Sequence, residues 1–484
     1  MQLDAVLDGL EYKVYGKAPR LGGISYDSRR VKPGDLFVAM VGQKFDGHDF
    51  VHEARERGAA CVLVERPIPD LDLTQVVVDN TRYALGIAAA NFYQHPSRKL
   101  RVVGVTGTNG KTTTTYLVKS ILEQAGYKVG LIGTIQILLG SQAVEAERTT
   151  PESLDLQRLL AQMVDEGVQY VVMEVSSHAL ELHRTAGLDF AGAIFTNLSQ
   201  DHLDFHPTME DYFQAKAKLF AGLKGPAAVN TDDPWGARLA EKVAQGLFSF
   251  GVESPAQFRA GKIKLENAGV SYILESKDGQ IGIDLQLMGM FNVYNSLGAA
   301  ALAAGLGCSL AQIKQGLEGI SGVPGRFERI FNAHGLNVVV DYAHTPHGLE
   351  NILRSARPLV PQGRIILVFG AGGDRDKGKR PLMGAVAAEL ADVGIITSDN
   401  PRSEDPAQIC SSIEKGLLRT NPQVQYSIEI DRRRAIRQAV AMATADDLVI
   451  VAGKGHETYQ EFAHGRIHFD DGEEVRAAIK ELKE

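Results

Sequence analysis

The residues that could do chemistry begin with a glycine-rich segment, Gly-Thr-Asn-Gly-Lys-Thr-Thr, at positions 107–113. Backbone N–H groups of such a loop can point at phosphate oxygens, and the N-terminus of a following helix adds a favourable dipole. Lys111 would then reach the outer phosphates of a nucleotide, and the Thr112 hydroxyl would ligate Mg²⁺. The candidates for binding a nucleoside triphosphate are Gly107, Thr108, Asn109, Gly110, Lys111, Thr112 and Thr113.

The match to the full phosphate-loop pattern, G-x-x-x-x-G-K-[ST], is incomplete because Val105 stands at the first glycine position. An ordinary strand-to-helix turn is the alternative interpretation, and the intact Gly-Lys-Thr core argues against it. The loop predicts triphosphate binding and does not by itself name a reaction.

A carboxylate and an imidazole follow further along the chain. Glu174 ends an apolar run, and His202 lies in the segment Gln-Asp-His-Leu-Asp at 200–204. Taken alone, each residue is more simply explained as a capping or hydrogen-bonded side chain. Beside a phosphate loop both can hold Mg²⁺, which usually keeps water and takes few protein ligands. We therefore predict that Glu174 and His202 hold Mg²⁺ against the triphosphate.

These residues require strands whose ends meet at one edge of a sheet. Apolar runs at 101–105 and 170–175 predict buried strands, and an amphipathic helix is predicted after the loop. The apolar face of that helix consists of Leu117, Val118, Ile121, Leu122 and Ala125. Alternating strands and helices predict an α/β fold with a parallel sheet covered on both faces. In such folds, ligands bind at the carboxyl ends of the strands.

The length of 484 residues corresponds to roughly three domains. We predict a small N-terminal α/β domain at 1–98, a central domain at 99–323 and a C-terminal α/β domain at 324–484. His95-Pro-Ser-Arg-Lys predicts a linker at the first boundary, and Gly322-Val-Pro-Gly marks the second. The last domain repeats the strand pattern with apolar runs at 338–341, 365–370, 394–397 and 447–453.

Composition narrows the class of protein further. Lys and Arg number 51 against 59 Asp and Glu, and this net charge of -8 argues against broad nucleic-acid binding. Cys61, Cys308 and Cys410 are too far apart in sequence for a metal-ligand pattern or a disulfide framework. The N-terminus carries acids where a signal peptide carries Lys or Arg, and no apolar run approaches ~18 residues. We expect a cytoplasmic monomer that binds small molecules, without a nucleic-acid or membrane partner.

A series of motifs along nearly the whole chain resembles the MurE type of the Mur ligase family. Each motif is weak alone, and their shared order makes the resemblance specific. The motifs are GTNGKTT, MEVSSHAL, NLSQDHLDFH, YFQAKAKLF, PGRFE, DYAHTP, GAGGDRDKGKRP, DNPR and VAGKGHE.

The resemblance implies a three-domain α/β architecture: a UDP-binding N-terminal domain, a central domain like P-loop ATPases and a Rossmann-like C-terminal domain. It implies an ATP- and Mg²⁺-dependent ligase of peptidoglycan precursor synthesis, and thus a role in cell-wall biogenesis, cell shape and cell division. The implied reaction adds meso-2,6-diaminopimelate to the D-glutamyl carboxylate of UDP-N-acetylmuramoyl-L-alanyl-D-glutamate through an acyl phosphate. It also implies that CO₂ carbamoylates Lys216 to N6-carboxylysine, an anionic Mg²⁺ ligand, so that Lys111, Glu174, His202 and Lys216 form the catalytic set.

The resemblance assigns further binding residues by motif position. The implied additional ATP contacts are Asn292, Asn295, Arg326, Asp341 and His344. The implied contacts of the UDP-substrate are Tyr26, Ser28, Gln43, Lys44, Phe45, Thr149, Thr150, Ser176 and Arg184. The implied contacts of diaminopimelate are Arg375, Asp399, Asn400, Pro401, Arg402, Gly453 and Glu457.

Arg402 is the residue on which the choice of amino acid depends. Diaminopimelate differs from lysine by a second carboxylate at its far end, and a guanidinium can bind that group with two hydrogen bonds. The alternative for Arg402 is an ion pair with Glu404 or Asp405 at the start of a helix.

Several other classes of protein share some of these features. A folylpolyglutamate synthetase would have the same loop and modified lysine, and a lysine-adding ligase would lack Arg402. A nucleotide switch would need no amino-acid-binding domain. A dinucleotide oxidoreductase is disfavoured because Arg375 replaces the last glycine of a G-x-G-x-x-G pattern.

Overall fold

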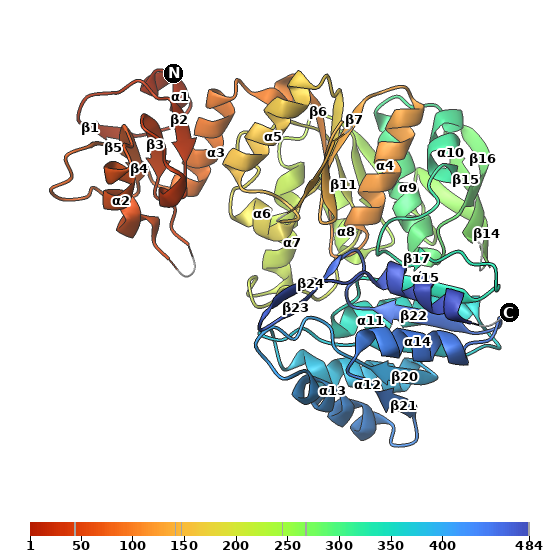
Figure 1. Cartoon of the computed structure of the whole chain (residues 1–484). Coiled ribbons are helices and arrows are strands. Elements are labelled where there is room, and N and C mark those ends of the chain that lie inside the picture. The colour runs from red at the N-terminus through yellow and green to blue at the C-terminus, as the bar shows by residue number, and fades with distance from the viewer. Residues whose placement is uncertain (43–44, 141, 147, 244, 267–268, 483–484) are drawn as a thin grey trace. The chain divides into compact units, whose positions relative to one another are not determined.

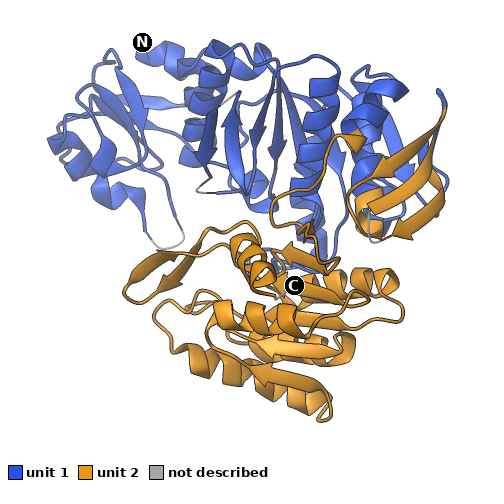
Figure 2. Cartoon of the chain, turned by 45° about the vertical axis from the view of Figure 1, so that its right-hand side comes forward, with its two compact units in different colours: residues 1–259, 275–279, 294–316 blue, residues 260–274, 280–293, 317–484 orange. Residues whose placement is uncertain are grey.

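The computed structural model describes residues 1–42, 45–140, 142–146, 148–243, 245–266 and 269–482 (Figure 1). The chain divides into two compact units, which Figure 2 shows in different colours. The first unit comprises 1–259, 275–279 and 294–316, and the second comprises 260–274, 280–293 and 317–484. The three-domain boundaries expected from the sequence remain predictions.

The N-terminal part of the first unit is a small α/β sandwich. Its sheet has the order β1-β5-β4-β3-β2, in which only β1 is antiparallel to its neighbour. The strands are β1 (Lys13–Tyr15), β2 (Gly23–Ser25), β3 (Asp35–Val38), β4 (Cys61–Val64) and β5 (Thr74–Val77). The helices are α1 (Leu3–Val6), α2 (Val51–Glu56) and α3 (Thr81–Phe92), with 3-10 turns η1 (Ser28–Arg30), η2 (Gly47–Phe50) and η3 (Pro96–Arg98). Successive residues of β4 point to opposite faces, so Leu63 packs with the cluster under α1 and α3, and Val62 with the cluster under α2.

The larger sheet of the first unit has the order β13-β12-β11-β6-β10-β7-β8-β9 and is parallel from β13 to β7. Its strands are β6 (Arg101–Thr106), β7 (Val129–Ile132), β8 (Gln136–Leu139), β9 (Gln142–Glu145), β10 (Tyr170–Glu174), β11 (Phe190–Phe195), β12 (Ala227–Asn230) and β13 (Leu247–Gly251). The helices are α4 (Lys111–Gln124), α5 (Ser153–Asp165), α6 (Ser177–Glu181), α7 (Met209–Ala217) and α8 (Pro234–Ala240), with the 3-10 turn η4 (Lys218–Phe220). Strand β6 is valine-rich and buried on both faces, as a central parallel strand must be.

Five elements lie partly in each unit. They are β14 (Phe258–Glu266), β15 (Gly269–Ser276), β16 (Gly279–Leu285), α9 (Met290–Gly305) and α10 (Leu310–Glu318).

The rest of the second unit is a three-layer α/β domain. Its sheet has the order β17-β18-β22-β19-β20-β21, and every pair except β17–β18 is parallel. The strands are β17 (Glu328–Arg329), β18 (Asn337–Asp341), β19 (Ile365–Phe369), β20 (Val393–Ile396), β21 (Gln425–Ile428) and β22 (Leu448–Ala452), with a separate hairpin of β23 (Tyr459–Phe462) and β24 (Gly465–His468). The helices are α11 (Pro346–Ala356), α12 (Lys379–Leu390), α13 (Pro406–Thr420), α14 (Arg432–Met442) and α15 (Asp471–Glu481), with the 3-10 turn η5 (Arg357–Leu359). One sheet face packs on α11, α12 and α13, and the other on α14 and α15.

The α/β class predicted from the sequence is confirmed. The predicted strands at 101–105, 170–175 and in the last third of the chain are all strands, with small shifts at their ends. The helix after the loop buries Leu117, Val118, Ile121 and Leu122, and Ala125 is its C-cap. The expected linker at 95–99 contains η3, where the buried Ser97 accepts a hydrogen bond from Asp189 N at 3.1 Å.

Candidate active site

The phosphate loop connects β6 to α4 and depends on two glycines in the left-handed region. Gly107 has φ +147° and Gly110, the N-cap of α4, has φ +85°. A Cβ at Gly107 would collide with Thr196 Oγ1, and one at Gly110 would collide with Asn295 Oδ1. Both the backbone angles and the close neighbours therefore require glycine here.

The end of β11 holds this loop in place. Thr108 N donates to Asn197 O at 2.9 Å, and Asn109 N donates to Asn197 Oδ1 at 3.0 Å. Thr196 Oγ1 donates to Asn109 O at 2.6 Å. The loop is thus fixed by contacts within the protein before any nucleotide binds.

Two predicted catalytic lysines meet at this loop. Lys111 Nζ donates to Gly107 O at 3.0 Å and to Thr108 O at 2.8 Å. Lys216 Nζ, from α7, donates to the same Gly107 O at 2.8 Å and lies 4.5 Å from the centre of the Tyr212 ring. Lys216 is 1% exposed. Burial, and secondly the charge of Lys111, lower the pKa of Lys216 well below its ordinary value, which favours the neutral amine.

His202 lies near both lysines, and Glu174 is held separately. Partial burial lowers the pKa of His202, and although Asp201 raises it, the charge of Lys111 lowers it further, so the net shift favours the neutral imidazole that a metal ligand must be. Glu174 is buried and lies opposite Val105 of β6. Its carboxylate accepts hydrogen bonds from Thr134 N at 2.8 Å and Thr134 Oγ1 at 3.2 Å.

The predicted UDP-substrate residues of the larger sheet form one connected group. Thr150 Oγ1 donates to the carbonyl of Glu174 at 2.9 Å and accepts from Ser176 N at 3.2 Å. Thr149 Oγ1 lies 3.0 Å from Thr134 Oγ1. Arg184 Nη1 donates to Thr150 O at 3.2 Å. The hydrogen bond from Thr150 Oγ1 to the backbone carbonyl of Glu174 therefore connects this group to a predicted metal ligand.

The predicted substrate residues near the N-terminus are more scattered. The Tyr26 hydroxyl donates to Asp155 Oδ2, and buried Ser28 donates to Glu53 Oε2 at 2.7 Å. Phe45 is 71% exposed. Gln43 and Lys44 lie outside the described residues.

The implied ATP contacts fall in both units. Asn295, in the first unit, accepts a hydrogen bond from Thr114 Oγ1 at 3.4 Å beside Gly110. Asn292, in the second, donates to Met288 O at 2.8 Å.

The other implied ATP contacts form a second group, within the second unit. Asp341 accepts from Phe327 N and Ala343 N at 2.7 and 2.8 Å, and the Arg326 guanidinium lies 5.0 Å from the centre of the Tyr342 ring. Arg326 Nε is buried without a hydrogen-bond partner among the described residues. His344 Nδ1 lies 2.9 Å from Tyr342 O, which orients its ring.

The predicted acceptor residues gather at the carboxyl ends of β20 and β22. Asn400 Nδ2 donates to Glu457 Oε2 at 2.8 Å, and Asn400 N donates to Asp399 Oδ1 at 2.7 Å. A Cβ at Gly453, φ +122°, would lie 2.5 Å from Asp399 Oδ2. That oxygen is buried and has no hydrogen-bond partner in the described part of the chain. Asp399 thus offers an unused carboxylate oxygen beside Gly453, as an amine-binding site requires.

Arg402 and Arg375 both lie close to Gly372. A Cβ at Gly372 would be 3.1 Å from Arg402 Nη1 and 3.8 Å from Arg375 Cγ. The ion pair considered from the sequence is replaced by another, because Arg402 Nε binds Glu461 Oε2 at 2.9 Å. Glu404 instead binds the buried Arg380 at 2.9 Å. Pro401 is buried, and a Cβ at Gly373 would collide with its carbonyl.

Comparisons with known proteins agree across the whole length. Sequence models described as "Mur ligase family, catalytic domain", "Mur ligase middle domain" and "Mur ligase, glutamate ligase domain" match residues 20–93, 105–303 and 325–455. The chain belongs to the Mur ligase family.

Several relatives of this Mur ligase carry one name. A UDP-N-acetylmuramoyl-L-alanyl-D-glutamate--2,6-diaminopimelate ligase from Caldanaerobacter subterraneus is 46% identical over 99% of both chains. The protein of that name from Clostridium tetani is 44% identical over 100% of both. A solved structure with that name has a TM-score of 0.71 and 32% identity, and covers 99% of both chains.

The donor set near the phosphate loop fits the Mg²⁺ that Mur ligases use with ATP. Thr112, Glu174 and His202 offer hydroxyl, carboxylate and neutral imidazole, and Mg²⁺ takes few protein ligands beside phosphates and water. Among the described residues, no three or more His, Cys, Asp or Glu side chains gather as a metal site of their own. So few protein donors are consistent with a Mg²⁺ site that the phosphates of a bound nucleotide complete.

Sequence reasoning missed several charged residues of this Mur ligase. Lys454 is fully buried, and its Nζ donates to Asn400 Oδ1 at 3.1 Å and Glu457 Oε2 at 3.0 Å. Lys454 lies in the VAGKGHE motif between Gly453 and Glu457, which were predicted to bind diaminopimelate, and this position could have indicated a role in the same site. Glu152, which is buried, lies within 3.5 Å of guanidinium nitrogens of Arg82, Arg148 and Arg184. Arg148 is only four residues from Glu152, but the pairing with Arg82 and Arg184, which are 70 and 32 residues away, leaves no local pattern.

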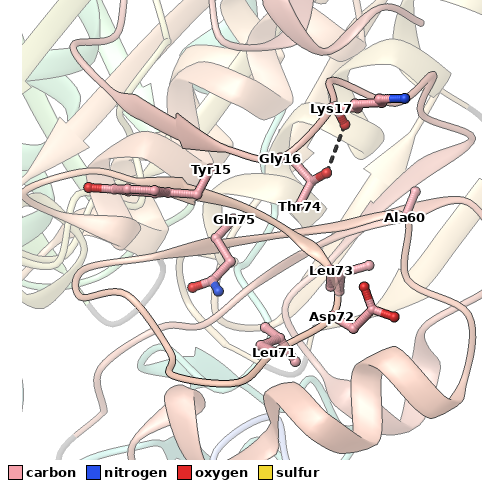
Figure 3. Close-up of a pocket in the computed structure, with 9 residues that line it drawn as sticks. All are labelled: Tyr15, Gly16, Lys17, Ala60, Leu71, Asp72, Leu73, Thr74 and Gln75. Atoms are coloured by element: carbon pink, nitrogen blue, oxygen red, sulfur yellow. Dashed lines mark hydrogen bonds between the residues drawn. The ribbon is translucent and has the colours of Figure 1, made fainter.

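A hollow of about 510 Å³ lies beside β1 and β5 (Figure 3). It is lined by Tyr15, Gly16, Lys17, Ala60, Leu71, Asp72, Leu73, Thr74 and Gln75. Thr74 Oγ1 donates to Lys17 O at 2.7 Å, and the Gln75 amide is bonded to the backbone of Ile68. None of the predicted site residues lines this hollow.

No helix in the described part of the chain combines the length and apolar character needed to cross a membrane.

Proposed function

We propose that this Mur ligase joins meso-2,6-diaminopimelate to the D-glutamyl carboxylate of UDP-N-acetylmuramoyl-L-alanyl-D-glutamate, with hydrolysis of ATP to ADP and phosphate. The observation that carries the proposal is Arg402, whose partner Glu461 is hydrogen-bonded through its backbone to Asn400, which in turn binds Glu457. A guanidinium there suits an acceptor with a second carboxylate, and lysine has none. Full-length relatives with this activity in their names support it.

Lys216 is the proposed site of carbamoylation. Its neutral amine, favoured by burial and by Lys111, attacks the carbon of CO₂, and the nitrogen then loses a proton to give a carbamate anion. Lys218, the other lysine of the motif, has a side chain 45% exposed and is paired with Glu181. An ammonium held in an ion pair has no lone pair with which to attack CO₂, so the burial of Lys216 supports its selection.

The proposed metal ligands are Thr112, Glu174, His202 and carbamoylated Lys216. Bound Mg²⁺ supplies positive charge that neutralises the phosphates during transfer. Carbamoylation replaces an ammonium, which repels a cation, with a hard oxygen ligand that attracts one.

The chain's own residues then carry out two successive displacements. An oxygen of the D-glutamyl carboxylate attacks the γ-phosphorus, the bond to ADP breaks, and Lys111 stabilises the charge on the phosphoryl group. The amine of diaminopimelate attacks the resulting acyl phosphate, loses a proton, and expels phosphate to leave the amide. Thr149, Thr150, Ser176 and Arg184 hold the peptide end of the UDP-substrate, beside Glu174.

The same proposal extends to the organisation of the chain. Residues 1–98 bind the UDP portion through Tyr26, Ser28 and the segment at 43–45, residues 99–323 bind ATP, and residues 324–484 bind the amino acid. The protein works as a cytoplasmic monomer on small-molecule substrates.

The test is release of phosphate from ATP by the purified protein with Mg²⁺ and UDP-N-acetylmuramoyl-L-alanyl-D-glutamate. Release is expected with meso-diaminopimelate and to a much smaller extent with L-lysine. Equal or greater release with lysine would reject diaminopimelate as the amino-acid substrate but would still support a ligase reaction. No release with either amino acid would reject the proposed reaction.

A further inference from the structure

Arg402 is held by strand β23 at both its backbone and its side chain. Its backbone has φ +52°, a left-handed conformation that is uncommon for arginine. Arg402 N donates to Glu461 O at 3.0 Å, and residue 402 forms a parallel bridge with Phe462. Residues held in such conformations persist when their surroundings fix them, and they cluster at functional sites.

The side chain of Arg402 is fixed from two directions. Nε donates to Glu461 Oε2 at 2.9 Å, and Nη1 donates to Gly373 O at 2.8 Å. Within the described residues, these bonds leave Nη2 available to a ligand. The Arg402 side chain is 23% exposed, so a bound molecule can reach it.

The charges around Glu461 leave the position attractive to an anion. Glu461 Oε1 lies 3.5 Å from Arg466 Nε, so two guanidinium groups flank a single carboxylate. The sum of these three charges is +1. Arg466 shares the carboxylate of Glu461 with Arg402, so this carboxylate does not neutralise Arg402 alone, although it occupies one edge of the guanidinium.

Glu461 is also connected to the other acceptor residues. Glu461 N donates to Asn400 Oδ1 at 2.9 Å, and that oxygen also accepts from Lys454 Nζ. The backbone of Glu461 and the side chains of Asn400 and Glu457 thus belong to one hydrogen-bonded network.

We propose that Glu461 is a positioning residue that sets specificity for the amino acid by aligning the guanidinium of Arg402. This rests on the proposed function, because it assigns Arg402 to the far carboxylate of diaminopimelate. A long arginine side chain loses rotational freedom when it binds a ligand, and Glu461 removes most of that loss beforehand. Glu461 acts through Arg402 and needs no contact with the substrate.

The experiment compares wild type, E461Q, R402Q and the double variant R402Q/E461Q in the full-length protein. We expect E461Q to raise KM for meso-diaminopimelate about tenfold, as expected for a hydrogen bond to a charged group. Its kcat, its KM for ATP and its KM for the UDP-substrate should stay within about twofold, and its preference over lysine should fall. In the R402Q background, E461Q should have almost no further effect on KM, because the residue through which it acts is gone.

The matched control is E474Q. Glu474 forms an arginine ion pair in the same unit, with Arg433 donating to both of its oxygens at 2.8 and 2.7 Å. E474Q should leave every KM unchanged. E461D keeps the charge on a shorter side chain and should give a KM between those of wild type and E461Q, which provides a second variant if E461Q does not fold.

Three outcomes would overturn the inference while wild type still consumes diaminopimelate. They are an unchanged KM in E461Q, an equal rise in KM in the R402Q background, and a parallel loss of affinity for all three substrates. Wild type that consumes no diaminopimelate would instead reject the proposed function itself.

Discussion

Lys111 and Lys216 donate hydrogen bonds to the same carbonyl oxygen, that of Gly107, at 3.0 and 2.8 Å. Lys111 follows Gly107 by four residues, whereas Lys216 comes from a helix more than a hundred residues later. Two ammonium groups bound to one acceptor repel each other, and Lys216 is the more deeply buried. This arrangement makes Lys216 the lysine that gives up its proton.

Replacing Lys216 with alanine should therefore abolish turnover, because the anionic metal ligand can no longer form. Small carboxylates such as acetate, added to K216A, should restore part of the activity by occupying the position of the carbamate. The measurement is phosphate release with meso-diaminopimelate. K218A is the control, because Lys218 is exposed and paired with Glu181, and it should retain activity within about threefold. A fully active K216A would exclude the carbamate.

Replacing a glycine by alanine can act through a collision of the new Cβ or through backbone strain. A variant of the phosphate loop and a matched control separate these two effects. G107A should lose ATP binding, measured by calorimetry, because its Cβ would collide with Thr196 Oγ1 and the loop would move. G126A is the matched control. Gly126 also has positive φ, +90°, and nothing lies within 4 Å of its Cβ. G126A should lose about 1–2 kcal/mol of stability through backbone strain and bind ATP normally. Equal ATP affinities in the two variants would contradict the role of the close contact.

His456 should contribute to acid sensitivity. Burial, with the nearby charges of Arg326 and Lys454, lowers its pKa to about 4 from an ordinary value of 6.5. The folded protein then binds fewer protons than the unfolded chain between these values, so stability is complete above pH 6.5 and falls as pH decreases toward 4. H456F should lose less stability than wild type over that interval. Parallel curves of unfolding free energy against pH for the two proteins would refute this.

The chemistry of the site follows largely from sequence where the residues belong to one local motif. The phosphate loop, the strand ending at Glu174 and the strand before Asp399 were each predicted from a continuous run. Contacts between segments that lie far apart in the sequence were not predicted. Nothing local to Arg402 indicates Glu461, which lies 59 residues further on, and nothing near Glu152 predicts its pairing with Arg82 and Arg184. The burial that distinguishes Lys216 from Lys218 likewise depends on how α7 packs.

The last prediction concerns Lys454, a buried lysine that donates hydrogen bonds to two proposed diaminopimelate contacts, Asn400 and Glu457. Methionine at this position fills similar volume but leaves Glu457 and Asn400 without their shared donor. K454M should therefore lose about 3 kcal/mol of unfolding free energy, the range found when one partner of a buried ion pair is removed. It should also raise KM for meso-diaminopimelate at least tenfold, since Glu457, a proposed contact of that substrate, would be displaced.

K415M provides the control, because Lys415 is exposed on α13 and should change neither quantity. Urea unfolding and steady-state kinetics on the same preparations distinguish the two effects. A destabilised K454M with an unchanged KM would mean that Lys454 supports the fold alone. A stable variant with normal kinetics would mean that Glu457 is held by its bond to Asn400 without help from the lysine.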